Sequence, residues 1–190
     1  MGRRLQDVTL DNLRIAPEEV LQTIYWESAE DDPSLDARFQ KEEWFSSTLL
    51  EWGPCGKLLV EDETCVGFAE YAPPSLFARL PTFPAGRASS DAIYLAYCFV
   101  TASRRDRGVG SELIRAIARD LVDRGFRAVE ALGEHAWTGG WILPGSFLEA
   151  NGFSVIRDDP ATALWRLDLL EARTPARTAA AAELPLPEGA

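Results

Sequence analysis

The sequence IYLAYCFVTASRRDRGVGS, residues 93–111, joins an almost continuous apolar run to a short loop rich in arginine and glycine. The apolar run, residues 93–100, predicts a strand buried on both faces. Apolar residues recur at helical spacing over 110–124, so a helix opens directly after the loop. Glycines let a backbone approach a ligand closely, and the first N–H groups of a helix lack partners within it. The stretch therefore predicts a strand–loop–helix unit that binds an anion, most naturally a pyrophosphate.

The charge around the loop favours a phosphate ligand. Residues 101–127 hold seven arginines and four acidic residues, a local net charge of +3 in a chain of −11, and Arg104, Arg105 and Arg107 lie in the loop itself. A nucleotide-binding P-loop would need a lysine here, and a dinucleotide fingerprint would need a third glycine after Gly108 and Gly110. From the residues alone, a turn with glycines for steric reasons and arginines for solubility is an equal alternative.

The elements around this unit indicate a mixed α/β domain. A strand over 127–132 follows the helix, and a strand–helix–strand succession implies a right-handed crossover with a parallel strand pair. The other predicted elements are, in chain order, a β-hairpin over 57–61 and 65–71, a proline-rich loop over 72–92, a short helix over 146–151 and strands over 153–157 and 162–169.

The N-terminal third is predicted to be helical and acidic. Apolar residues at helical spacing favour two helices between 17 and 51, the second running from 34 to 52. The apolar stripe of the second helix is Leu35, Phe39, Trp44, Phe45 and Leu49. Residues 17–51 hold ten acidic and two basic residues, so −8 of the total charge of −11 lies there. Such a surface favours cationic partners, with a solubilising helix face as an equal alternative.

Length and composition bound the classes of function. A chain of 190 residues, 46% of them hydrophobic, fits one domain over 1–170 and an Ala/Pro-rich tail over 171–190 that we expect to be disordered. The net charge of −11 argues against nucleic-acid binding, and no apolar run approaches the roughly 20 residues of a membrane span. No apolar core follows the N-terminal arginines, so no signal peptide is expected, and three scattered cysteines favour a cytoplasmic protein.

The loop and its surroundings resemble the N-acetyltransferases of the GNAT superfamily. The resemblance is carried by the spacing R-x-x-G-x-G over 105–110, by the order of elements over 56–169, and by the Gly-Phe pair at 152–153 after the short helix. The pattern is also similar to that of an actinobacterial branch of the superfamily. The resemblance implies a single domain of mixed α+β class, with a mostly antiparallel central sheet, one parallel strand pair and flanking helices.

The resemblance also implies acetyl-CoA, or another acyl-CoA, as co-substrate, and no metal. The residues that would hold the pyrophosphate through their backbone N–H groups are Arg105, Asp106, Arg107, Gly108, Val109, Gly110 and Ser111. Main-chain groups of Cys98, Phe99 and Val100 would pair with the pantetheine arm like an added strand. The N-terminal helices would form one wall of the acceptor cleft.

The sequence departs from the family pattern at two catalytic positions. Leu148 stands where many relatives have a tyrosine that protonates the leaving thiolate, and the strand segment 95–97 lacks the glutamate that many relatives have. We expect Glu70 and His135 as candidate bases and Tyr97 as a candidate acid. The alternatives are that Glu70 is an exposed carboxylate on an edge strand and that His135 is a structural or exposed loop residue.

Together these residues predict an N-acetyltransferase that moves an acetyl group from acetyl-CoA to an amine by direct attack through a tetrahedral intermediate. The acidic N-terminal third favours a cationic acceptor, either a small molecule or a peptide amine. No nucleic-acid or membrane partner is expected, and a homodimer stays open. The alternative function is a non-catalytic acyl-CoA-binding sensor or regulatory module, because the two family side chains are missing.

Overall fold

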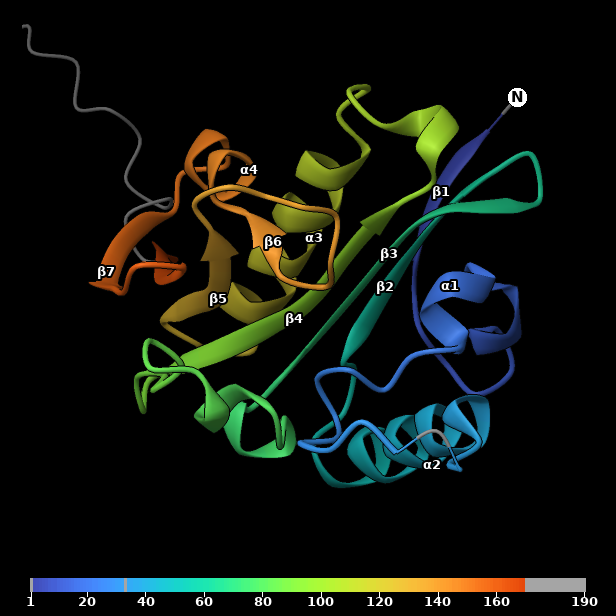
Figure 1. Cartoon of the computed structure of the whole chain (residues 1–190). Helices are drawn as coiled ribbons and strands as arrows, with labels where there is room; N and C mark the ends of the chain where they lie inside the picture. The colour runs from blue at the N-terminus through green and yellow to red at the C-terminus, as the bar shows by residue number, and fades with distance from the viewer. Residues whose placement is uncertain (1, 33, 170–190) are drawn as a thin grey trace, which may run out of the picture.

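The computed structural model describes residues 2–32 and 34–169. Over these residues, eight strands form one sheet in the order β1-β2-β3-β4-β5-β8-β7, with β6 paired to β5 (Figure 1). The strands are β1 (Arg3–Asp7), β2 (Gly56–Glu61), β3 (Thr64–Ala72), β4 (Ala92–Val100), β5 (Ala128–Glu134), β6 (Leu143–Pro144), β7 (Ser154–Asp158) and β8 (Thr162–Asp168). The predicted mixed fold with a mostly antiparallel sheet is confirmed, whereas β1 and β6 were not predicted.

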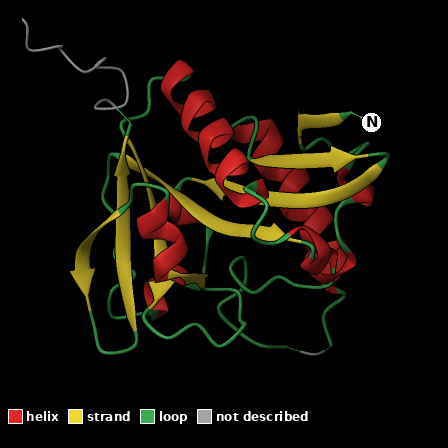
Figure 2. Ribbon diagram, turned by 90° about the horizontal axis from the view of Figure 1, so that it is seen from above, coloured by secondary structure: helices red, strands yellow, loops and turns green. Residues whose placement is uncertain are grey.

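Strands β4 and β5 form the predicted parallel pair, but they are neighbours only where they begin. Pairing joins Ala92–Tyr94 to Ala128–Glu130 and then stops, and the two strands diverge (Figure 1). Figure 2 shows β5, β7 and β8 as one group of strands and β1–β3 as another, with β4 crossing between them. Two residues of β6 pair with Gly133 and Glu134 in place of β4. The edge of β4 over 95–100 therefore has no strand partner within the described chain; we call it the free edge of β4.

Helices cover both faces of the sheet. The α-helices of the described residues are α1 (Glu18–Leu21), α2 (Ala37–Glu51), α3 (Val109–Asp123) and α4 (Gly145–Ala150). One apolar core lies on the face covered by α1 and α2, and a second lies on the face covered by α3 and α4. We call these the α2 face and the α3 face. Because side chains alternate along a strand, Tyr97 and Phe99 of β4 lie on the α2 face, and Cys98 and Val100 lie on the α3 face.

The apolar stripe predicted for α2 is wrong in its first half. Phe39 is 60% exposed and Leu35, before the helix, is 40% exposed, whereas Lys41 and Thr48 are buried beside Phe45. Positions 41, 45 and 48 lie on one face of a helix, so α2 turns a lysine toward the core. Patterning by polarity missed this face because it counts lysine among the residues that face water.

The remaining segments complete the comparison with the sequence. The first N-terminal helix, α1, has four residues and is shorter than predicted. The loop over 72–92 contains two short 3-10 turns, Pro74–Leu76 and Leu80–Thr82. The tail over 171–190 lies outside the described residues. Among the helices of the described part of the chain, none combines the length and the apolar character needed to cross a membrane.

Candidate functional site

The loop between β4 and α3 ends in a left-handed turn. Gly108 is the N-cap of α3 with φ of +77°, and an added Cβ there would meet nothing within 4 Å. The first helical hydrogen bond of α3 runs from the N–H of Glu112 to the carbonyl of Gly108 at 3.0 Å, and no side chain caps the helix. Within the described chain, the N–H groups of residues 109–111 thus remain without an acceptor, as an anion site at a helix start requires.

The three arginines of the loop have different surroundings. Arg104 donates from Nε to the carboxylate of Glu61 on β2 at 2.7 Å, which ties the loop to the β2–β3 hairpin. Arg105 donates from Nε to the carbonyl of Val100 at 3.2 Å, and Arg107 is exposed. Arg104 thus has a carboxylate partner on the hairpin, and the expectation that the three arginines serve a phosphate stays a prediction.

A β-bulge precedes the free edge of β4. Glu70 of β3 lies opposite Tyr97, whereas the next residue, Tyr71, lies opposite Leu95, so Ala96 is an extra residue in β4. A bulge bends its strand and increases the local twist. The bend occurs just where β4 leaves β5, and it helps to keep the backbone of the following residues free.

The three residues after Tyr97 present their backbone on this free edge. An extended chain could add to Cys98, Phe99 and Val100 as a further strand. The Cys98 sulfur lies 4.0 Å from the carbonyl oxygen of Gly110, at the start of α3. Burial raises the pKa of the Cys98 thiol to about 12, so this cysteine stays protonated at neutral pH and has little nucleophilic character.

Helix α4 packs against the start of α3. The ring of Phe147 is so close to Gly110 that an added Cβ would come within 2.8 Å of it. Only a glycine allows this approach of the two helices. The next residue, Leu148, is fully buried in the core of the α3 face. The position that carries a tyrosine in many relatives therefore holds an apolar side chain with no proton to donate.

Four side chains on the α2 face, Glu27, Lys41, Glu70 and Tyr97, form a buried polar group that we call the Lys41 cluster. The Lys41 ammonium bonds Oε1 of Glu27 and, at 3.2 Å, Oε2 of Glu70, and it lies 4.1 Å from the centre of the Tyr97 ring. The side chains of Lys41 and Glu70 are 0% exposed and that of Glu27 is 5% exposed. The alternative of Glu70 as an exposed carboxylate is therefore wrong.

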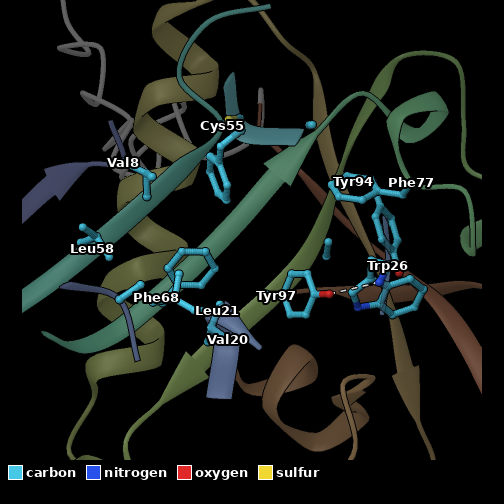
Figure 3. Close-up of a cluster of buried hydrophobic side chains, with 14 of the residues drawn as sticks. Val8, Val20, Leu21, Trp26, Cys55, Leu58, Phe68, Phe77, Tyr94 and Tyr97 are labelled. Carbon is cyan, nitrogen blue, oxygen red and sulfur yellow. Dashed lines mark hydrogen bonds between the residues drawn. The ribbon is translucent and has the colours of Figure 1, made fainter. Parts of the chain in front are cut away.

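The hydroxyl of Tyr97 links this cluster to the segment before α2. It donates to Oε2 of Glu27 at 2.8 Å. It also accepts the backbone N–H of Trp26 at 3.1 Å (Figure 3). Burial raises the pKa of Tyr97 well above its usual value, and the nearby carboxylates of Glu27 and Glu70 raise it further. The hydroxyl therefore keeps its proton, and delivering that proton to a thiolate would break its bond to Glu27.

The charges in the cluster are unequal, with two carboxyls for one ammonium. Burial lowers the pKa of Lys41, but Glu27 and Glu70 outweigh burial and raise it, so the ammonium stays charged. Burial and the neighbouring Glu27 raise the pKa of Glu70 well above its usual value. Oε1 of Glu70 has no hydrogen-bond partner among the described residues. Ionisable groups perturbed in this way mark candidate functional sites.

Replacing Glu70 by glutamine should weaken the pH dependence of stability. Because the pKa of Glu70 is raised in the folded chain, the folded state keeps a proton that the unfolded chain releases above about pH 4.5. The free energy of unfolding of the wild-type protein should therefore fall as the pH rises above about 5, by at most about 1.4 kcal/mol per pH unit from this group. Urea unfolding across this range measures it, and equal slopes in the two proteins would contradict the prediction.

Sequence reasoning missed Glu27 and Lys41. Glu27 lies near the end of the first predicted helix, just before an acidic segment, and nothing in its neighbours distinguishes it from the other carboxylates. Lys41 did carry a signal, because it precedes Phe45 by four residues and therefore shares a helical face with a residue of the core. A charged residue at such a position is buried only with partners, so it points to a polar site.

His135 lies apart from the Lys41 cluster. Its Nε2 is 2.8 Å from a carboxylate oxygen of Asp158 and 3.0 Å from the carbonyl oxygen of Asp159, and the side chain is 42% exposed. These contacts attach the imidazole to the turn between β7 and β8. Within the described chain none of its hydrogen bonds reaches the cluster, and a role for His135 as base stays a prediction.

A pocket of about 690 Å³ opens beside the segment that precedes α2. The acidic residues that line it are Glu30, Asp31, Asp32 and Asp36. Arg79, also in its wall, binds Asp31 at 2.5 Å. Trp141 belongs to the wall as well, and its ring centre lies 5.5 Å from that of Tyr97. Trp141 thus belongs to the wall of the acidic pocket and also packs against Tyr97 of the Lys41 cluster.

A model of the acetyltransferase (GNAT) family matches residues 19–137, more than half of the chain, and the chain belongs to this family. The match covers α2, the β2–β3 hairpin, β4, the loop with its left-handed turn, α3 and β5. The predicted family membership is confirmed, and with it the class of enzyme, an acyl-CoA N-acyltransferase. No curated protein matches the chain in sequence.

Solved structures of low sequence identity share the fold. An N-acetyltransferase from Staphylococcus aureus Mu50 has a TM-score of 0.59 at 16% identity, over 89% of this chain and 99% of that one. A PaiA N-acetyltransferase from Thermoplasma acidophilum, solved with coenzyme A, has a TM-score of 0.55 at 13% identity, over 88% and 99%. A protein from Salmonella typhimurium, solved with acetyl-CoA, has a TM-score of 0.59 at 13% identity, over 100% of both chains.

Proposed function

We propose that this enzyme transfers the acetyl group of acetyl-CoA to a cationic primary amine, carried by a small molecule or by a peptide. The observation that carries the proposal is the arrangement along β4. An anion-binding loop follows its C-terminal end, its free edge runs back from there, and Tyr97 on the α2 face adjoins the wall of the acidic pocket. The two ends suit a phosphorylated donor and a cationic acceptor.

The donor end fits acetyl-CoA in three respects. The N–H groups of residues 109–111 and the guanidinium groups of Arg105 and Arg107 would hold the pyrophosphate. The backbone of residues 98–100 would pair with the pantetheine arm as an added strand. Three residues of extended strand span about 10 Å, which would bring the thioester to the level of Tyr97. Two structural neighbours solved with coenzyme A or acetyl-CoA support this donor.

The acceptor end favours a positive charge. Four carboxylates and one arginine line the acidic pocket, so a cationic amine would be attracted to it and oriented with a charged group outward. A primary amine with a pKa of about 10.4 costs about 4.6 kcal/mol to deprotonate at pH 7. A base near Tyr97 would lower this cost before the amine attacks the thioester carbon, and a backbone N–H of β4 would stabilise the oxyanion of the tetrahedral intermediate.

One observation favours a second candidate function, a non-catalytic acyl-CoA-binding sensor. Leu148 has no proton to give a thiolate, and residues 95–97 include no carboxylate. Incubation of the full chain with acetyl-CoA and an amine panel separates the two functions. The enzyme should release CoA thiol from acetyl-CoA faster with spermidine or a lysine-containing peptide as acceptor than with propylamine. Tight binding of acetyl-CoA without acceptor-dependent thiol release from any amine would overturn catalysis in favour of the sensor.

Removing charge from the pocket should weaken binding of the acceptor selectively. Glu30→Gln deletes a carboxylate whose side chain has no described ion-pair partner, so KM for spermidine should rise about threefold to tenfold at low ionic strength, with less effect at high salt. Steady-state kinetics at two salt concentrations measure the change. Glu51→Gln, at the exposed end of α2, makes the same change in net charge outside the pocket. Equal KM values for the two variants would contradict an acidic acceptor pocket.

A further inference from the structure

We propose that Glu27 is the general base that takes a proton from the acceptor ammonium, and that Lys41 and Tyr97 are positioning residues that hold its carboxylate. The inference rests on the proposed function and names the residue that does its proton transfer. It is carried by the place of Glu27 in the molecule, by its two hydrogen-bond partners, and by the burial of the cluster around it.

Glu27 directly follows a segment that borders the acidic pocket, and it contacts β4. Tyr25, two residues before it, lines the pocket, and Trp26 donates from its indole N–H to the carbonyl of Trp141 at 3.2 Å in the pocket wall. Glu27 itself accepts the hydroxyl of Tyr97 at 2.8 Å. Cys98, which follows Tyr97 in β4, begins the stretch proposed for the pantetheine arm. An amine that passes Trp141 toward the thioester would therefore meet the carboxylate of Glu27.

The carboxylate of Glu27 is fixed and still has capacity to accept a proton. Oε1 accepts from the Lys41 ammonium and Oε2 accepts from the hydroxyl of Tyr97. Each carboxylate oxygen has two lone pairs, so each retains one after these bonds. The groups that face Glu27 are Lys41 from α2, Glu70 from β3 and Tyr97 from β4. Of these, the Lys41 ammonium is the cation, and it lies against Oε1 of Glu27.

Glu70 is less suited to the same step. Its side chain is 0% exposed, and its hydrogen bond within the cluster is with the ammonium of Lys41. Burial and Glu27 raise the pKa of Glu70 well above its usual value, so it tends to carry a proton already. A protonated carboxyl cannot accept a further proton, and of the two carboxyls it is Glu27 that accepts the hydroxyl of Tyr97 on β4.

The step balances without a further reactant. Glu27 takes one proton from the ammonium, and the nitrogen lone pair then forms the C–N bond at the thioester carbon. The C–S bond breaks, its electron pair leaves on sulfur, and the second proton that the nitrogen loses neutralises the thiolate. The proton on Glu27 returns to water. Because the nitrogen supplies the proton for sulfur, the apolar Leu148 is no obstacle to turnover.

The test compares Glu27→Gln with Glu27→Asp in the full chain, using spermidine and acetyl-CoA. In Glu27→Gln, kcat should fall about 100-fold or more, while KM for acetyl-CoA stays within about twofold. Its rate should also rise about tenfold per pH unit between pH 6 and 9, because only the free amine now reacts. Glu27→Asp keeps a carboxylate, so it should recover part of kcat and retain the shallower pH dependence of the wild-type enzyme. Glu42→Gln, exposed on α2 next to Lys41, is the matched control and should keep the wild-type kcat.

Each outcome is decisive. A kcat of Glu27→Gln within about threefold of wild type overturns the base assignment while leaving the acetyltransferase intact. A wild-type chain that releases no thiol with any amine overturns both proposals. If Glu27→Gln does not fold, Tyr97→Phe takes its place, because it removes one of the two bonds that hold the carboxylate. It should lower kcat about fivefold to thirtyfold with KM unchanged, and an unchanged kcat would again overturn the proposal.

Discussion

Replacing Lys41 by methionine is expected to lower the free energy of unfolding by about 3–5 kcal/mol. Methionine has nearly the length of lysine, so the change removes the charge and leaves little cavity. The buried carboxyl groups of Glu27 and Glu70 then lose the cation that both contact. An uncompensated buried charge costs far more than the loss of an exposed ion pair. Urea unfolding at pH 7 measures the change.

Two further variants check the cause of this loss. Arg38→Met removes a cation from the same helix, where Arg38 pairs with the exposed Glu18, and should change stability much less. Adding Glu70→Gln to Lys41→Met should restore part of the stability, because it removes one of the two unpaired carboxyls. If Lys41→Met were as stable as Arg38→Met, the cluster would not be held by charge, and its role as a support for Glu27 would fail with it.

Gly108→Glu is expected to lower the affinity for acetyl-CoA about 100-fold or more, a loss of at least about 2.7 kcal/mol of binding free energy. The substitution acts in two ways. A residue with a Cβ is strained at φ of +77°, by roughly 1–2 kcal/mol, and the new carboxylate lies at the N–H groups that would hold the pyrophosphate. Isothermal titration with acetyl-CoA measures the affinity, and unfolding in urea measures the strain separately.

The chain supplies a matched control at the other end of the same helix. Gly125 follows α3 with φ of +83°, and an added Cβ there also meets nothing within 4 Å. Gly125→Glu therefore introduces the same side chain with the same kind of strain, away from the loop. It should cost similar stability and leave the affinity for acetyl-CoA unchanged. Equal affinities of Gly108→Glu and Gly125→Glu would mean that the turn before α3 does not bind the phosphates.

The proposed donor end of the site could be predicted from the sequence because its signals are local. An apolar strand, a loop with glycines and arginines, and a helix follow one another within 93–124, so neighbours in sequence are neighbours in space. The hairpin and the parallel pair followed for the same reason. Arg104 is the exception: its partner Glu61 is 43 residues away in the chain, and no local pattern indicates that contact.

The proposed acceptor end depends on the tertiary structure. The sequence by itself determined that the N-terminal third is acidic, and it named Glu70 and Tyr97 among many polar residues. Only the fold brings Glu27, Lys41, Glu70 and Tyr97 together from a loop, a helix and two strands. From local periodicity, a lysine is predicted to face solvent, because burying an ammonium without a partner is costly. The carboxylates that make its burial favourable are 14 and 29 residues away, so their contact exists only in the folded chain.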